Sequence, residues 1–219
     1  MSTKAASKAA ASASTSQADG IPGKLSLKRL ARLSDFIYAA ALLILLATVT
    51  FAPTELSNRE EAWTYLTTEI EVWVTFAISF LIIAYYWISH QIYFSYYIRT
   101  DKVHSFLELV YLMFLVVMPV GTHFVGTHPG LFEAKLLASY DIVMVGVMQF
   151  ITWSYATRND RLVAPGVPDT ATRTALSVQA LVLPAAAIVA AVAAYFYSPL
   201  WEVVLIVGPV LATLRSRLG

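Results

Sequence analysis

Residues 72–91 read VWVTFAISFLIIAYYWISHQ, and this stretch determines the fold class. It contains no Lys, Arg, Asp or Glu, and its length is close to the roughly 20 residues that an α-helix needs to cross about 30 Å of hydrocarbon. Its apolar residues do not alternate with polar ones, as they would in a strand of a membrane β-barrel. The stretch therefore predicts a transmembrane helix.

Five further apolar segments lie along the chain, each bounded by charged residues, Pro or Gly. They cover residues 33–51, 105–123, 135–155, 175–197 and a shorter 200–214. Together with residues 72–91 they predict an all-α integral membrane protein with six transmembrane helices. The segment at 175–197 is rich in alanine, which allows a helix to approach its neighbour closely.

The composition excludes several classes of protein. Of the 219 residues, 58% are hydrophobic and only 13% are charged, against about 45–50% and 25% in soluble domains. The mean hydropathy is +0.65. A net charge of +1 lacks the basic excess of a nucleic-acid-binding protein. The absence of cysteine excludes disulfides, thiolate metal sites and a cysteine nucleophile.

The distribution of positive charge predicts the topology. Residues 1–23 are rich in Ala, Ser, Thr and Lys, and we expect them to form a disordered tail before a transmembrane domain at 24–219. Thirteen of the 15 Lys and Arg residues lie before the first segment, between the second and third segments, between the fourth and fifth segments, or at the C-terminal end. The two exceptions are Arg59 and Lys135. By the positive-inside rule, six crossings then place both termini in the cytoplasm.

Ionisable residues inside the predicted spans are few. Each costs at least ~2.5 kcal/mol to insert, so each is expected to have a partner or a function. Asp35 begins the first span, His90 and Gln91 end the second, and Glu108 begins the third. They would lie at one level of the membrane, where a structural polar network and a proton relay both remain open interpretations. The scattered histidines lack metal-ligand spacing, so we expect no metal site.

The first span carries an apolar stripe at helical spacing. The stripe consists of Leu33, Ile37, Ala40, Ile44, Ala47 and Phe51. A charge-free stripe could line a pore that closes by dewetting, but several copies around an axis would be needed to enclose it. The sequence lacks the Thr-Val-Gly-Tyr-Gly filter and the common hydrolase, zinc-protease and nucleotide-binding motifs. A pore, a carrier and a membrane scaffold therefore remain open.

Two stretches resemble the transmembrane protein 175 family, which comprises endosomal and lysosomal potassium channels and shorter bacterial relatives. Residues 29–35, RLARLSD, are similar to the family's Arg-x-x-x-Phe-Ser-Asp signature, with Leu33 in place of Phe. Residues 79–91, SFLIIAYYWISHQ, resemble its second helix, with Gln91 in place of a His. The third span, with its Met118-Pro119 end, also looks similar.

The resemblance implies a homotetramer in which the first helix of each subunit lines a central cation pathway with a hydrophobic constriction. The residues at the matching constriction positions are Ala40, Ile44 and Ala47, with Leu43 beside them. Because two of the three are alanines, Ile44 is expected to form the tightest ring. The resemblance also implies a structural network of Arg29, Ser34, Asp35, Trp87 and His90.

Through this resemblance, we expect a potassium-permeable channel domain in a bacterial plasma membrane. Its expected partners are other copies of the chain, membrane lipid and potassium ions as the permeant species, with no cofactor, no nucleic acid and no enzymatic activity. One alternative is a proton-coupled secondary transporter that uses Asp35, Glu108, Asp141 and the histidines. The other is a membrane scaffold that transports nothing.

Overall fold

The computed structural model describes residues 26–49 and 58–207. Its elements are α2 (Leu27–Ala47), α3 (Arg59–Thr68), α4 (Ile70–Tyr96), α5 (Lys102–Thr127), α6 (Phe132–Thr157), the short 3-10 helix η1 (Arg158–Asp160) and α7 (Thr170–Phe196). Residues 200–207 are also helical. The predicted tail at 1–23 and Phe51 of the apolar stripe lie outside the described residues.

The predicted all-α membrane fold is confirmed. In the described part of the chain, α2, α4, α5, α6 continuing through η1, and α7 are each long and apolar enough to cross a membrane. These five helices coincide with the first five predicted segments. The sixth predicted segment, 200–214, extends past the described residues, so a sixth crossing remains a prediction.

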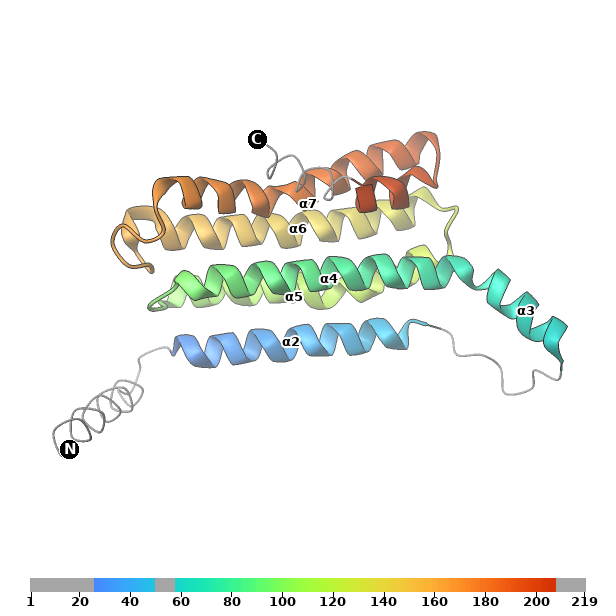
Figure 1. Cartoon of the computed structure of the whole chain (residues 1–219), viewed down its shortest axis with the longest axis horizontal. Coiled ribbons are helices and arrows are strands. Elements are labelled where there is room, and N and C mark those ends of the chain that lie inside the picture. Colours follow the sequence, from blue (N-terminus) through green and yellow to red (C-terminus); the bar gives the residue numbers. More distant parts are fainter. Residues whose placement is uncertain (1–25, 50–57, 208–219) are drawn as a thin grey trace, which may run out of the picture.

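The long helices run side by side in a fixed order (Figure 1). α2 forms one edge of the bundle and packs against α4 and α5, while α6 packs on α5 and α7 packs on α6. The connections α4–α5 and α6–α7 lie at the end of the bundle where α2 begins, and α3 projects from the opposite end. α2 is therefore a peripheral helix held along one side.

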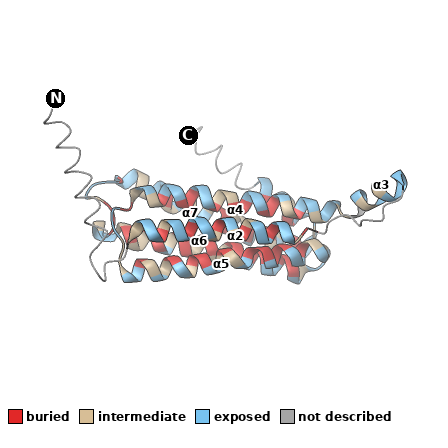
Figure 2. Ribbon diagram, turned by 90° about the horizontal axis from the view of Figure 1, so that it is seen from below, coloured by how far each residue is buried: buried red, intermediate tan, exposed pale blue. Residues whose placement is uncertain are grey.

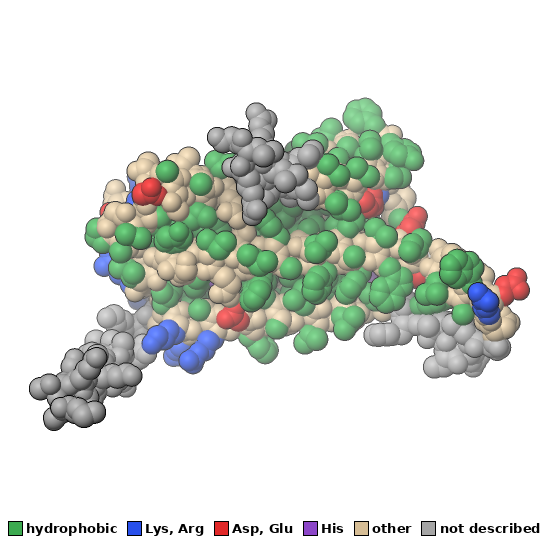
Figure 3. Space-filling view, in the orientation of Figure 1, with side chains coloured by type: hydrophobic (Ala, Val, Ile, Leu, Met, Phe, Trp, Pro, Cys, Tyr) green, Lys and Arg blue, Asp and Glu red, His purple; other side chains and the backbone are tan. Residues whose placement is uncertain are grey.

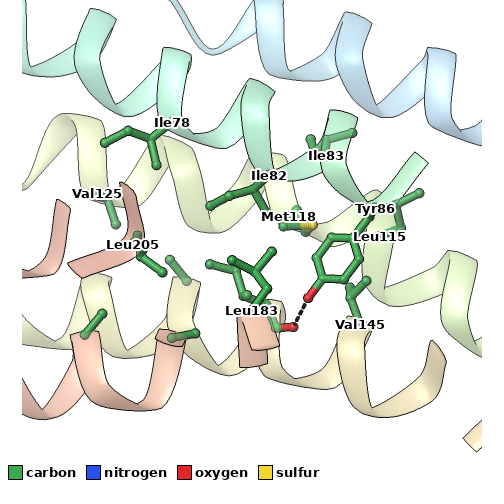
Figure 4. Packing of buried hydrophobic residues seen from close by; sticks show 14 of the residues in the cluster. Ile78, Ile82, Ile83, Tyr86, Leu115, Met118, Val125, Val145, Leu183 and Leu205 are labelled. Carbon is green, nitrogen blue, oxygen red and sulfur yellow. Dashed lines mark hydrogen bonds between the residues drawn. The ribbon is translucent and has the colours of Figure 1, made fainter. Parts of the chain in front are cut away.

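Large apolar side chains fill the space between α4, α5, α6 and α7. Figure 4 shows Ile82 of α4, Met118 of α5 and Leu183 of α7 converging in this core. The Tyr86 hydroxyl is buried there and donates a hydrogen bond to the Ile142 carbonyl at 2.8 Å. Leu205 from the helical residues 200–207 joins the same cluster, so that segment folds back on the bundle.

Small residues set the close approach of α6 and α7. A Cβ on Gly146 would lie 2.1 Å from Cγ of Pro184, so only glycine fits opposite that proline. Beyond Pro184, the buried Ala187, Ala190 and Ala194 form the α7 side of the contact. The close packing predicted from the alanine-rich segment is therefore present, as expected when small side chains let membrane helices approach.

Helix boundaries differ from those expected. The spans extend by several residues into flanking polar sequence, because caps such as Asp101, which accepts the His104 backbone N–H at 2.8 Å, lie outside the apolar runs. α5 continues through Pro119 to Thr127, since proline is tolerated inside membrane helices. α3 was not expected, because its polar sequence lies between two apolar segments.

Lys and Arg side chains are distributed unequally between the two ends of the bundle. Figure 3 shows Lys and Arg gathered over the first turns of α2. The loops at 97–101 and 158–169, which carry Arg99, Arg158 and Arg161, lie at this same end. Arg59 and Lys135 belong to α3 and the start of α6 at the other end. The fold thus keeps the predicted charge asymmetry, and which end faces the cytoplasm remains a prediction.

Candidate pore helix and its polar anchor

α2 has one face in the bundle and one face outside it. Leu30, Ser34, Tyr38, Ala41 and Leu45 are buried against the neighbouring helices. The opposite face is exposed along its length in one subunit, as Figure 2 shows. This division gives the helix a fixed side and a free side.

The predicted constriction residues lie on or beside the free face. Leu43 is 68% exposed and Ile44 is 45% exposed. Ala47 is exposed, and Ala40 is half-buried at the border with the packed face. Beside them, Phe36 is 71% exposed. Beyond the first turns, which carry the exposed Arg29, Arg32 and Asp35, the free face of α2 is therefore apolar.

Asp35 anchors the start of α2 to the end of α4. Its Oδ1 accepts hydrogen bonds from the Gln91 amide at 2.7 Å and from the Trp87 indole N–H at 3.3 Å. Both donors lie on α4 one turn apart, so a single carboxylate oxygen fixes the rotation of one helix against the other. Gln91 stands where the transmembrane protein 175 family has a histidine. Its amide is closer to Asp35 Oδ1 than the Trp87 indole N–H is.

Glu108 of α5 joins the same anchor from inside the bundle. Its Oε1 lies 2.5 Å from Nε2 of His90 and 3.4 Å from the Ser34 hydroxyl, which also donates to the Leu30 carbonyl at 3.1 Å. Glu108, His90 and Ser34 are each at most 4% exposed. The buried carboxylate therefore connects α2, α4 and α5.

Aromatic side chains enclose this buried pair. The His90 ring stacks on Phe94 with centroids 4.2 Å apart and on Tyr111 at 5.7 Å. Tyr38 of α2 meets the edge of the same ring at 5.6 Å, and its hydroxyl forms a short hydrogen bond with that of Tyr111. The aromatic rings shield the His90–Glu108 pair from bulk solvent.

The network includes most of the residues predicted for it, but not all. Ser34, Asp35, Trp87 and His90 come together as described. Arg29 is exposed, and within residues 26–49 and 58–207 its side chain forms no hydrogen bond or ion pair. Arg32, three residues before Asp35, likewise forms no ion pair in the described structure, because Asp35 is turned toward α4.

Asp101 connects the start of α5 to the end of α6 next to this anchor. Its carboxylate accepts the His104 backbone N–H and the Tyr155 hydroxyl, both at 2.8 Å, and Arg161 donates to that hydroxyl at 2.7 Å. Burial acts to raise the pKa of Asp101, but these hydrogen bonds outweigh burial and hold the pKa below its usual value. Asp101 is therefore ionised at neutral pH.

Two other ionisable side chains lie inside the opposite half of the bundle. Lys135 is 2% exposed, pairs with Glu202 at 2.8 Å and donates to the Ser198 carbonyl at 2.7 Å. Asp141 is 4% exposed, and its Oδ2 has no hydrogen-bond partner among the described residues. The described part of the chain contains no group of three or more His, Asp or Glu side chains placed to bind a metal.

Sequence reasoning missed the polar groups of the central helices. Tyr111, Gln149 and Thr152 are buried beside His90 and Glu108. One sequence feature could have indicated these buried polar groups. Gln149 and Thr152 are three residues apart within an apolar run, which places both side chains on one face of α6. Nothing in the sequence indicates that this face meets the end of α4.

Comparison with known proteins supports the resemblance. The sequence model of the family described as endosomal/lysosomal potassium channel TMEM175 matches residues 29–119. This region includes both the 29–35 signature and the 79–91 helix. A potassium channel of Streptomyces collinus is 27% identical over 149 residues, which is 66% of this chain and 71% of the relative. The resemblance stated from the sequence is thereby confirmed.

Solved structures share the fold. The crystal structure of a lysosomal potassium-selective channel TMEM175 homologue from Chamaesiphon minutus superposes with a TM-score of 0.73 at 20% identity, covering 87% of this chain and 97% of that one. A crystal structure of a variant of the potassium channel MtTMEM175 superposes with a TM-score of 0.60 at 15% identity, covering 90% and 98%. At these identities the comparison establishes the fold.

Proposed function

We propose, from the match of residues 29–119 to the TMEM175 family, that this chain forms a potassium-permeable cation channel. Four copies would surround a central axis in the membrane, with α2 of each copy lining the pathway. The observation that carries the proposal is the division of α2 into an anchored face and a free apolar face. A helix at the edge of the bundle, held in rotation by Asp35 and Ser34, presents the same free residues from every copy.

The proposed conducting path is closed by a hydrophobic constriction rather than a filter of backbone carbonyls. Ile44 is the bulky side chain of the stripe at this level, since Ala40 and Ala47 flank it one turn away on either side. A ring of four isoleucines can prevent ion passage by dewetting, while the flanking alanines leave wider vestibules. Leu43 lies beside Ile44 on the free face of α2.

Substituted-cysteine block tests the constriction. Ile44→Cys should conduct in reconstituted bilayers and lose most of its current on addition of a thiol reagent, because the chain has no native cysteine. Ile188→Cys is the matched control, since Ile188 is 54% exposed on α7, away from α2. Equal insensitivity of both variants would overturn the placement of the constriction.

A secondary transporter is the second candidate, and Asp141 is the observation that favours it. A carboxyl that is 4% exposed within a membrane helix is costly unless it has a role, and transporters use such groups to carry protons. Under the transporter proposal, Asp141→Asn abolishes flux. Under the channel proposal the substitution leaves conductance unchanged, because α6 is separated from α2 by α4 and α5.

A further inference from the structure

A small cavity of about 10 Å³ lies between α4, α5 and α6, beside the polar anchor. A single water molecule requires about 10–15 Å³ of such space, together with two to four polar partners. The cavity is lined by His90, Tyr93, Phe94, Tyr97, Glu108, Tyr111, Gln149 and Thr152. Its size therefore matches one water molecule and no larger ligand.

Unpaired polar groups surround this cavity. Gln149 is 5% exposed, and neither its Oε1 nor its Nε2 has a hydrogen-bond partner in the described structure. His90 uses Nε2 toward Glu108, while its Nδ1 is buried and unpaired among the same residues. In the interior of a membrane protein an unpaired amide is strongly unfavourable, since neither lipid nor apolar side chains can replace its hydrogen bonds.

We propose that this cavity binds one internal water molecule, which connects the Gln149 amide to the Glu108 carboxylate. The water accepts a hydrogen bond from Gln149 Nε2 and donates one to Glu108. Thr152 supplies a further acceptor, because its hydroxyl proton is directed to the Met148 carbonyl at 2.9 Å and its oxygen lone pairs stay available. The aromatic rings around the cavity confine it to a single molecule.

The water extends the anchor of α2 to a further helix. Glu108 already connects His90 of α4 to Ser34 of α2. Through the water, Gln149 of α6 becomes part of the same hydrogen-bonded chain. The inference concerns the interior of one subunit and does not depend on ion conduction, so the two proposals can fail separately.

Thermal unfolding of the purified protein tests the site. Replacing Gln149 by leucine keeps most of the side-chain volume and removes the amide. If the water connects Gln149 to Glu108, Gln149→Leu lowers the Tm by about 2–4 °C, because the bound water loses a partner. The neighbouring Met148→Leu, an apolar exchange at 8% exposure, is the matched control with an unchanged Tm. A Tm for Gln149→Leu equal to or above that of the native chain would overturn the proposal.

A double-mutant cycle tests whether Gln149 and Glu108 act together, as two partners of one water molecule must. Glu108→Gln and Gln149→Leu should be non-additive, because the two native side chains form no direct hydrogen bond and share the water. Additive effects on Tm would contradict the bridge.

If Gln149→Leu does not fold, a high-resolution density map of the native protein tests whether a water molecule lies between Gln149 and Glu108. A peak at about 2.7–3.2 Å from both side chains supports the site. A direct contact between Gln149 and Glu108 with no such peak overturns it.

Discussion

Asp35 holds α2 through one oxygen atom. Because Trp87 and Gln91 both donate to Oδ1, the carboxylate fixes both the height and the rotation of α2 against α4. Inside the bundle, Glu108 likewise contacts two helices through one carboxylate oxygen, with His90 of α4 and Ser34 of α2 as partners. The residues that orient α2, the proposed pore helix, are therefore separate from those proposed to meet the ion.

If the chain forms the proposed tetramer, Asp35→Ala should lower the yield of that assembly. The substitution removes the acceptor of two hydrogen bonds, so α2 loses its fixed rotation and its free face no longer matches that of the next subunit. Size-exclusion chromatography in mild detergent measures the tetramer fraction. Glu133→Ala is the control, because Glu133 is exposed in the first turn of α6. Normal assembly with normal current would exclude this anchoring role.

Asp101 predicts a pH dependence of stability. Its pKa is lowered in the folded chain, so its ionised form contributes stability that is present above the unfolded pKa of about 3.9 and is lost as the pH falls through the lower folded pKa. Asp101→Asn keeps a helix-capping side chain and removes this titration. Between about pH 5 and pH 3 the variant's Tm should fall less steeply than that of the native chain. Parallel curves would refute the prediction.

The sequence predicted at which level of the bundle the polar side chains lie, but not which hydrogen-bond partners they have. Asp35, His90 and Glu108 could be placed at one level because helical spans have a known rise per residue. The partners of Asp35 could not be deduced, because the rotation of α2 about its axis depends on packing with α4. The same holds for Gln149, whose polar face could have met any neighbouring helix.

The five long helices follow from the length of the apolar segments, while their ends and contacts depend on local chemistry. Polar caps extend the helices beyond the apolar runs, and Pro119 does not end α5. α3 was missed although the sequence carries a signal for its start, because Asn58 is followed three residues later by Glu61. In the structure the Asn58 side chain accepts the Glu61 backbone N–H at 2.9 Å. At the level of elements, hydropathy locates helices and capping decides where they stop.

Gly146→Ala should destabilise the contact between α6 and α7. The added methyl group would lie 2.1 Å from Cγ of Pro184 and 3.0 Å from the Ala180 carbonyl oxygen, so one helix must shift. Overpacking of this kind costs about 1–3 kcal/mol. Gly126→Ala in α5 is the matched control, because its nearest atom would be 3.7 Å away. Thermal unfolding of both variants measures the difference, and an equal Tm would contradict the packing described.

The described part of the subunit combines a bundle whose buried charged side chains are mostly paired with an exposed apolar face along one edge. Apart from Asp141, the buried charged residues have partners among the described residues, with Glu108 on His90 and Lys135 on Glu202. The free apolar face of α2 lies at the edge of the bundle, opposite α7 (Figure 1). In a homotetramer each copy would present this face to the axis, since closed symmetry repeats one surface around it.

Planar-bilayer recording of the purified chain tests whether it conducts potassium as a channel. With potassium chloride at unequal concentrations on the two sides, the channel account predicts discrete single-channel steps. It also predicts a reversal potential shifted toward the potassium equilibrium potential. Smooth, saturable flux that depends on a proton gradient, or a reversal potential shifted toward that of chloride, would contradict it.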